Sequence, residues 1–375
     1  MRKTALLLLL LTTTAAFCEA PVVHERLTMD QAVDLALKQR PELQPVADKV
    51  RREEMATGSG LAALAAPASP GLGTSERPAF LAKPVFNDVM TLSKPLSNGP
   101  RVQRQVASDL MGTEATEDAQ RAQVTEIIRT TRQQWLTAML AREKSDVYHD
   151  IVSKEAEANQ LAQSLLEAGS VPQVVIYRAK LAVADTQQQL NNADCEASKA
   201  VMDLKLAMGV DQASDVTLNG KLADKPTPLP DLSAVVQLAL QQRPDLEAAR
   251  LELTRAEMQA QERNASQATR TQAVLLKSRT DAISQIVKRD VYKAYADVQN
   301  QTNNLTLTAP AIDAAQENYR IAVLRFQTGR GIQLEVIDAL GALGKAQVNN
   351  LEAACDYQKS LVELNWAIGG GAVSQ

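Results

Sequence analysis

The stretch AVDLALKQRPELQPVADKVRREEM at residues 32–55 returns as VVQLALQQRPDLEAARLELTRAEM at residues 235–258, with eleven identities in 24 positions. A second pair shows the same relation, because residues 169–209 align with residues 329–369 at eleven of 41 positions. The chain is therefore a tandem duplication. The offset is 203 residues in the first pair and 160 in the second, so the second copy lacks 43 residues between its conserved blocks.

The composition favours long helices. Only 3% of the 375 residues are aromatic, while Ala, Leu, Gln, Glu, Lys and Arg dominate, as in long helices that pack through small side chains. The formal net charge is −4 and the chain has no long run of one sign. The charge pattern therefore argues against nucleic acid as a partner.

The first twenty residues have the pattern of a secretory signal. Arg2 and Lys3 precede an apolar run at 5–11 and small residues at 12–16. Cys18 raises the alternative of a lipidated terminus, but Phe17 before it is large for an acylation site, so ordinary cleavage near residue 16 or 20 is favoured. No other segment has the eighteen or so apolar residues of a membrane helix, so any crossing of a membrane would have to use strands.

The first copy predicts a short helix followed by a long helical hairpin. Thr28 and Gln31 form a capping box that opens the short helix, and residues 57–100 are rich in Pro and Gly, which favours loop or edge strand. Residues 101–168 contain no proline and predict a helix of about 100 Å at ~1.5 Å per residue. Gly169 then predicts the end of this helix, and Pro172 predicts the first turn of the next one, so the two helices form a hairpin.

The second copy predicts the same hairpin without the Pro/Gly segment. Apolar and small residues from Val287 to Phe326 alternate between spacings of three and four, the seam of a coiled coil, and Gly329-Arg330-Gly331 closes the turn. Pro244, like Pro41 in the first copy, either kinks or restarts its helix. The expected organisation is a signal peptide at 1–20, a first repeat at 21–209 (helix 28–56, possible β segment 57–100, hairpin 101–209), a linker at 210–230, a second repeat at 231–369 (helix 231–264, hairpin 280–369) and a tail at 370–375.

These features together resemble the TolC-like outer-membrane efflux family. The resemblance rests on TMDQAVDLALKQRPEL, its repeat VVQLALQQRPDL, and the glycine turn YRIAVLRFQTGRGIQLEVIDAL with its closing LVELNWAIG. It implies a mainly α fold, two tandem repeats of long antiparallel coiled-coil hairpins that form one protomer of an α-barrel. At most a reduced β-hairpin is expected in residues 57–100. In the family each copy supplies a β-hairpin, and the second copy here has lost that segment.

The same resemblance implies a location and partners. The chain is expected in the cell outer membrane, in contact with its lipid and with most of the chain in the periplasm, as a homotrimer that works with a periplasmic adaptor and an inner-membrane pump. The implied function is the passive exit duct of a tripartite efflux or type I secretion system. The alternative, suggested by the missing residues, is a degenerate periplasmic scaffold that keeps the coiled-coil body but forms no conducting pore.

Two acids follow the second glycine turn. Glu335 and Asp338 lie three residues apart on one predicted helix face, where the family resemblance implies an acidic ring that constricts the channel. The alternative is that they only complement the helix dipole. Arg178 aligns with Asp338 and could link the two hairpins as a gate, although an exposed arginine explains it as well. The turn residues Gly169, Pro172, Gly329 and Gly331 are the expected docking points for the adaptor.

Nothing in the chain suggests an enzyme. His24 and His149 have no Cys, Ser or carboxylate arrangement around them, so we expect no catalytic, cofactor or metal site. Cys195 and Cys355 are repeat equivalents on the closing helices of their hairpins, and two small buried side chains are favoured over a disulfide. Trp135 continues an apolar seam and is expected in the core.

Overall fold

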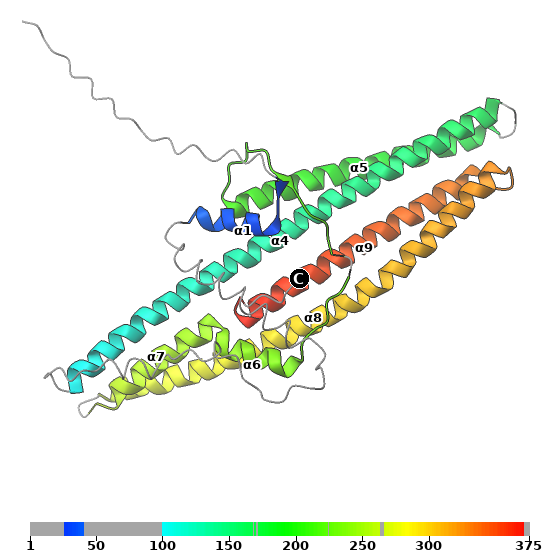
Figure 1. The fold of residues 1–375 in the computed structure, drawn as a ribbon. Helices are drawn as coiled ribbons and strands as arrows, with labels where there is room; N and C mark the ends of the chain where they lie inside the picture. Colours follow the sequence, from blue (N-terminus) through cyan, green and yellow to red (C-terminus); the bar gives the residue numbers. More distant parts are fainter. Residues whose placement is uncertain are drawn as a thin grey trace, which may run out of the picture.

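The computed structural model describes residues 26–40, 100–167, 169, 172–223, 225–262 and 266–370. Two long helical hairpins dominate it and lie side by side with their turns at the same end (Figure 1). The first hairpin consists of α4 (Pro100–Glu167) and α5 (Gln173–Met208), and the second of α8 (Gln267–Gln327) and α9 (Gln333–Ile368). The expected fold class, two repeats of long antiparallel helical hairpins, is confirmed.

The four long helices form one layer in the order α5, α4, α9, α8, so that α4 and α9 meet in the middle and α5 and α8 form the two edges (Figure 1). Three short helices pack on this layer. α1 (Met29–Lys38) lies on α4, α6 (Leu232–Gln242) on α8 and α9, and α7 (Pro244–Ala260) between α4 and α8. α1 begins with the capping box of Thr28 and Gln31.

The helix expected at 231–264 is divided at Arg243. Pro244 occupies the first turn of α7, and Arg243 has extended backbone angles of φ −67° and ψ 116°. The proline has no N–H to continue α6, and its ring disfavours a helical conformation for the residue before it. Proline therefore restarts the helix here rather than kinking it.

The segment between the repeats is tied to the body. Thr217–Leu218 (β2) pairs in parallel with Arg26–Leu27 (β1), the N–H of Leu222 donates to Glu143 Oε1 at 3.2 Å, and Arg142 donates to the carbonyl of Leu218. Burial raises the pKa of the Glu143 carboxyl, against the opposing effect of the Leu222 hydrogen bond. The first hairpin and the segment that leads to the second are thus one packed unit.

The main core lies where the short helices meet the middle of the layer. Trp135, Met139, Leu204, Tyr357 and Leu364 are among its buried members, and they come from three of the four long helices. Trp135 is a core residue, as expected. Among the described residues no helix is long and apolar enough to cross a membrane. Of the possible β segment at 57–100, residues 57–99 lie outside the described residues and Pro100 begins α4.

Candidate functional site

The two hairpin turns are built alike. Gly169 and Gly329 follow α4 and α8 with φ of 70° and 68°, and their N–H groups donate to Leu166 O at 2.8 Å and Phe326 O at 3.1 Å. A Cβ at either glycine would meet nothing within 4 Å. The left-handed backbone, not crowding, is therefore what requires glycine at both positions.

The second turn is the tighter one. The N–H groups of Arg330 and Gly331 both donate to the carbonyl of Arg325 at 2.9 Å. A Cβ on Gly331 would lie 3.0 Å from Arg325 Cβ and 3.2 Å from Glu335 Oε2, so this glycine is needed for space. Pro172 and Ile332 occupy the equivalent N-cap positions of α5 and α9, and neither helix has a side-chain cap.

Apolar side chains join the two turns into one body, here called the tip cluster. All four long helices contribute to it, and its buried members are Ala162, Ile176, Ala322, Phe326, Val336 and Ala339. Gln333, which is 1% exposed, adds a polar tie between the hairpins by donating from Nε2 to the carbonyl of Ala158 at 3.3 Å. Separating the hairpins at this end would expose the cluster and break that bond.

The predicted site residues all lie at this end. Glu335 is half-buried in the first turn of α9, with its Oε2 3.6 Å from Arg325 Nη1, whereas Asp338 is exposed. Arg178 lines a shallow cavity of about 60 Å³ between α5 and the start of α9, with Ile332 and Ile337 among its neighbours. The structure thus brings Arg178 to the helix that bears both acids. The ion pair of Glu335 in the described chain is with Arg325, and the gate link through Arg178 stays a prediction.

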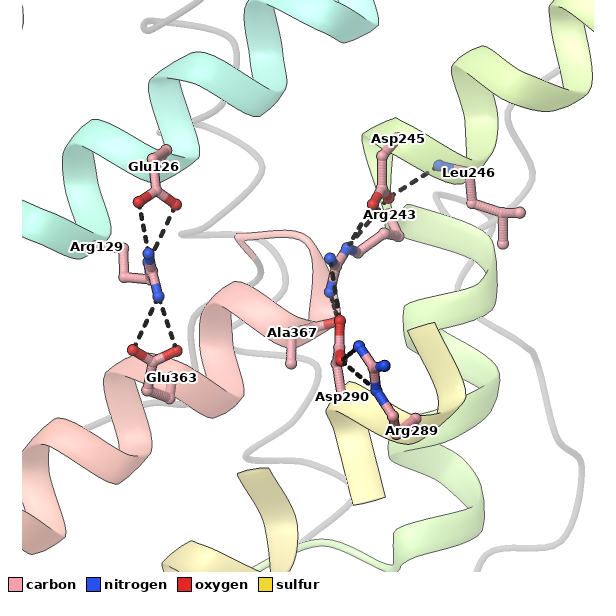
Figure 2. Close-up of polar contacts among 9 residues, drawn as sticks. All are labelled: Glu126, Arg129, Arg243, Asp245, Leu246, Arg289, Asp290, Glu363 and Ala367. Carbon is pink, nitrogen blue, oxygen red and sulfur yellow. Dashed lines mark hydrogen bonds and ion pairs between the residues drawn. The ribbon is translucent and has the colours of Figure 1, made fainter. Parts of the chain in front are cut away.

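A second arrangement, at the other end of α9, was not predicted from the sequence. We call it the arginine clasp, and Figure 2 shows its polar contacts. Arg129 on α4 binds Glu126 at 2.5 Å and Glu363 on α9 at 3.0 Å, with its guanidinium 4.7 Å from the ring centroid of Trp366. Burial opposes the charge of Arg129, but its two carboxylate partners outweigh this effect and raise its pKa.

Arg243 forms the other half of the clasp. It is 7% exposed, lies 4.4 Å from the centroid of the Trp366 ring, and binds Asp245 at 3.1 Å and Asp290 at 3.6 Å. Its Nη1 also donates to the carbonyl of Ala367 at 3.2 Å (Figure 2). One buried guanidinium therefore joins the restart of α7, the α8 helix and the last turn of α9. Arginine suits this position because its planar fork binds several acceptors and also stacks on an aromatic face.

The sequence carried a partial signal for the clasp. Arg243 belongs to the repeated Arg-Pro pair, and Trp366 to the closing string LVELNWAIG. The proline explained the helix break. The partners of Arg243 lie elsewhere, because Ala367 is more than a hundred residues away in the chain and Asp290 is on another helix. Sequence spacing alone could not bring them together.

A buried carboxyl lies on the first hairpin between the clasp and the tip. Glu155 on α4 is 3% exposed; its Oε1 accepts a hydrogen bond from Thr186 on α5 at 3.0 Å, while its Oε2 has no partner among the described residues. Burial raises the pKa of this carboxyl, against the opposing effect of Thr186. The second hairpin has Ala315 and Ala346 at the equivalent positions, so hairpin packing does not itself require the polar pair.

The two repeat-equivalent cysteines differ. Both are free thiols; Cys355 is 0% exposed, with its Sγ 3.6 Å from the carbonyl oxygen of Leu136, and burial raises its pKa to about 11. Cys195 is exposed, contrary to the expectation of two buried side chains. The difference arises because Cys355 lies on the inner helix α9 and Cys195 on the edge helix α5. Within the described part of the chain no group of His, Cys, Asp and Glu is arranged to hold a metal.

Comparisons with known proteins agree with this geometry. Residues 82–210 match the sequence model of the outer membrane efflux protein family. Comparison with curated proteins yields no significant sequence match.

Several solved outer-membrane channels share the fold. The channel OprN is 16% identical with a TM-score of 0.63, over 92% of this chain and 90% of its own. VceC from Vibrio cholerae is 13% identical with a TM-score of 0.61, over 92% and 97% of the two chains. The MtrE channel of Neisseria gonorrhoeae, solved in an open state, is 15% identical with a TM-score of 0.60, over 92% and 89%. At these identities the likeness establishes the fold.

Proposed function

We propose a function from the premise that this chain is a TolC-like protein of the outer membrane efflux family, as its repeats and glycine turns had indicated. It serves as the outer-membrane exit duct of an efflux system, a passive channel with no chemistry of its own. Its location is the cell outer membrane, with the long hairpins in the periplasm. Small molecules, or proteins in a type I secretion system, would leave the cell through it.

One observation carries this proposal. The chain forms one layer in which two similar hairpins lie side by side with both turns at the same end, so it can serve as one part of a channel wall (Figure 1). A single segment encloses nothing, so a duct requires several copies, and we propose the homotrimer that the family implies. Among the described residues, each of the edge helices α5 and α8 packs mainly against one other long helix and also contacts some of the short helices α1, α6 and α7.

The tips supply the features that a gate needs. Glu335 and Asp338 would contribute six carboxylates to a constriction in a trimer, which attracts cations and repels anions. The tip cluster and the Gln333 tie would hold that end closed until a partner separates the hairpins. Exposed apolar side chains close to the turns, Val174 and Ile332, give a periplasmic adaptor a surface beside Gly169, Pro172, Gly329 and Gly331, and the adaptor would link the duct to an inner-membrane pump.

The test is electrical. The full-length protein, purified in detergent and added to planar lipid bilayers, should produce discrete conductance steps that protein-free detergent does not. If the protein is oligomeric in detergent yet produces no steps, the duct proposal fails.

A scaffold without a pore is the second candidate, and one observation favours it. α7 ends at Ala260 and α8 begins at Gln267, so the second repeat connects these helices through six residues. In sequence, the first repeat has 43 more residues than the second between its two conserved blocks. A scaffold would assemble and bind the adaptor but would not conduct.

A further inference from the structure

A cavity of about 380 Å³ lies where the segment between the repeats passes over α4. It is lined by Arg142 of α4 and by residues 217–220, which are Thr217, Leu218, Asn219 and Gly220. Small-molecule sites in proteins have volumes of about 300–1,000 Å³, so a small ligand would fit. None of the residues of the tip cluster or the arginine clasp lines this cavity, so the proposed duct function does not account for it.

Main-chain hydrogen bonds fix one wall of the cavity. β2 pairs with β1, the N–H of Asn219 donates to the carbonyl of Leu27 at 2.9 Å, and Arg142 donates from Nη1 to the carbonyl of Leu218. The side chains of Thr217 and Asn219 have no hydrogen bond with another described residue. The wall is therefore held in place while its polar side chains stay free for a ligand.

Arg142 brings a positive charge to the cavity. Its Nη1 binds the Leu218 carbonyl, and among the described residues it has no ion pair. The Nε–Nη2 edge of the guanidinium thus retains its N–H groups. This edge is a planar fork that matches the two oxygens of a carboxylate. None of the lining residues is an acid that would occupy the fork first.

A buried donor beside the cavity also lacks an acceptor. Trp135 is 5% exposed, and its Nε1 has no hydrogen-bond partner in the described part of the chain. A Cβ added to Gly220 would lie 3.3 Å from Trp135 Cζ2, and Nε1 is two bonds away from that atom in the indole ring. Buried N–H groups without an acceptor are rare because they are costly. The charged group and the buried group at this place are both donors, so the component that is missing is an acceptor.

The second repeat shows that helix packing does not itself require these donors. The shift of 160 residues that relates α5 to α9 equates Trp135 with Tyr295 of α8. Tyr295 donates from its hydroxyl to the carbonyl of Pro230 at 3.1 Å, so the aromatic residue there has a main-chain acceptor. The same shift equates Arg142 with Thr302, which carries no charge. A cation beside an aromatic donor that lacks an acceptor is specific to the first repeat.

The neighbouring charges indicate which anion fits. Burial raises the pKa of Glu143, while Lys221 lowers it and Asp146 raises it, so these charges lie near one another. Together with Arg142 the neighbourhood holds two cations and two acids. It has no excess of positive charge to hold a multiply charged anion, so recognition must come from the fork of Arg142. A singly charged carboxylate suits this site better than phosphate does.

We propose that this cavity binds a small molecule through its carboxylate group. The carboxylate oxygens accept hydrogen bonds from the Nε–Nη2 edge of Arg142, and the side chains of Thr217 and Asn219 supply further donors. The cavity is complete within one chain. The site and the duct are therefore independent, and either can hold without the other.

Calorimetric titration of the full-length protein in an uncharged detergent tests the ligand class. N-acetylalanine, which has one carboxylate and no charged amine, should bind saturably. N-acetylalanine amide, which lacks the carboxylate, should not bind, and inorganic phosphate should bind at least about tenfold more weakly. Failure of N-acetylalanine to bind, or equal binding of the amide or of phosphate, would overturn the proposal. Lactate is the comparison for the source of the carboxylate, because tighter binding of lactate favours a free organic acid and tighter binding of N-acetylalanine favours the end of a peptide.

Variants of Arg142 test the fork. Arg142→Gln should weaken the binding of N-acetylalanine about tenfold or more, because a charge-assisted bidentate pair is lost. Arg142→Lys keeps the charge but not the planar fork, and it should lose most of the affinity as well. Arg279→Gln is the matched control, because it removes an exposed arginine elsewhere on the surface and should bind as the wild type does.

A second variant separates binding from folding, since Arg142 also holds the Leu218 carbonyl. Thr217→Val combined with Asn219→Leu keeps that bond and the main-chain bonds, so it should weaken binding without lowering the melting temperature. Unchanged affinity in this variant and in Arg142→Gln would show that the ligand binds elsewhere.

Fluorescence locates the ligand directly. The chain has two tryptophans, and Trp366→Phe leaves Trp135 as the only one while it keeps an aromatic ring at the arginine clasp. The emission of Trp135 should change on titration with N-acetylalanine, with the dissociation constant that calorimetry gives. Saturable binding by calorimetry with no change in this emission would contradict a site beside Trp135.

Discussion

The guanidinium of Arg243 lies over the indole ring of Trp366, 4.4 Å from its centroid, and connects two elements that the sequence separates by more than a hundred residues. Arg243 is the residue between the end of α6 and the start of α7, and Trp366 lies in the last turns of α9. Arg129 lies over the same ring from α4. The Trp366 ring thus contacts two guanidinium groups, each of which is paired with carboxylates. These contacts hold the end of the second repeat against the first.

Replacement of Arg243 by alanine should destabilise the protein strongly. It removes the buried guanidinium and its charged hydrogen bonds, while Asp245 is 40% exposed and Asp290 keeps Arg289 at 2.8 Å, so the expected cost is about 1.5–3 kcal/mol. Urea denaturation followed by circular dichroism measures the change. Arg279→Ala is the control, because its pair with Glu252 is at the surface and should be worth less than about 1 kcal/mol. Similar losses in both variants would show that the clasp has no special role.

Alanine at two glycines should separate the effect of backbone conformation from that of free space. Gly329→Ala should cost about 1–2 kcal/mol, because φ is 68° although no atom lies near the new methyl group. Gly341→Ala, inside α9 with nothing within 4 Å, should instead stabilise by up to about 1 kcal/mol. The midpoint of thermal unfolding, compared with that of the wild type, should fall for Gly329→Ala and rise for Gly341→Ala. A stabilised Gly329→Ala would mean that the turn does not keep its left-handed glycine in the assembled protein.

The Glu155–Thr186 pair should make stability depend on pH. Its carboxyl has a raised pKa in the folded chain, so the folded state holds the proton longer than the unfolded state, whose ordinary value is 4.5. The contribution of this carboxyl to stability is therefore fully present below pH 4.5 and is lost as the pH rises through its raised pKa. The double variant E155A/T186A, which copies the second hairpin, should lose this part of the pH dependence.

Thr186→Ala alone is the informative comparison. It leaves the carboxyl buried without its one hydrogen bond and should cost about 1–3 kcal/mol at neutral pH. The double variant should be at least as stable as the Thr186→Ala variant at that pH. If the melting temperatures of wild type and double variant run parallel from pH 4 to pH 8, Glu155 is not the source of the dependence.

The acids at the tip should contribute unequally to ion selectivity if the chain is a duct. Arg325 lies 3.6 Å from Glu335 and partly neutralises it, whereas Asp338 is exposed. Asp338→Asn should therefore reduce the preference for cations more than Glu335→Gln, as measured by the reversal potential in a salt gradient. Asp313→Asn, an exposed acid far from the turn, should have no effect. An active channel whose selectivity is unchanged in the double variant of Glu335 and Asp338 would remove the acidic ring.

The sequence by itself determined the repeats, the helical class and the positions of the turns. These features depend on neighbours in the chain: a glycine tolerates positive φ, a proline ends a hydrogen-bonded run, and apolar spacings of three and four define a helix face. Gly169, Gly329 and Pro244 could therefore be placed without coordinates.

Only the tertiary structure decided which repeat equivalents share an environment. Cys195 and Cys355 have the same place in their repeats, yet one is exposed and the other buried, because α5 is an edge of the layer and α9 is inside it. The same reason separates Arg129 on the inner helix α4, which pairs with Glu363 of α9, from Arg289 on the edge helix α8, which pairs with Asp290 of its own helix. Repetition in sequence sets the local shape of each hairpin, whereas burial depends on what packs beside it.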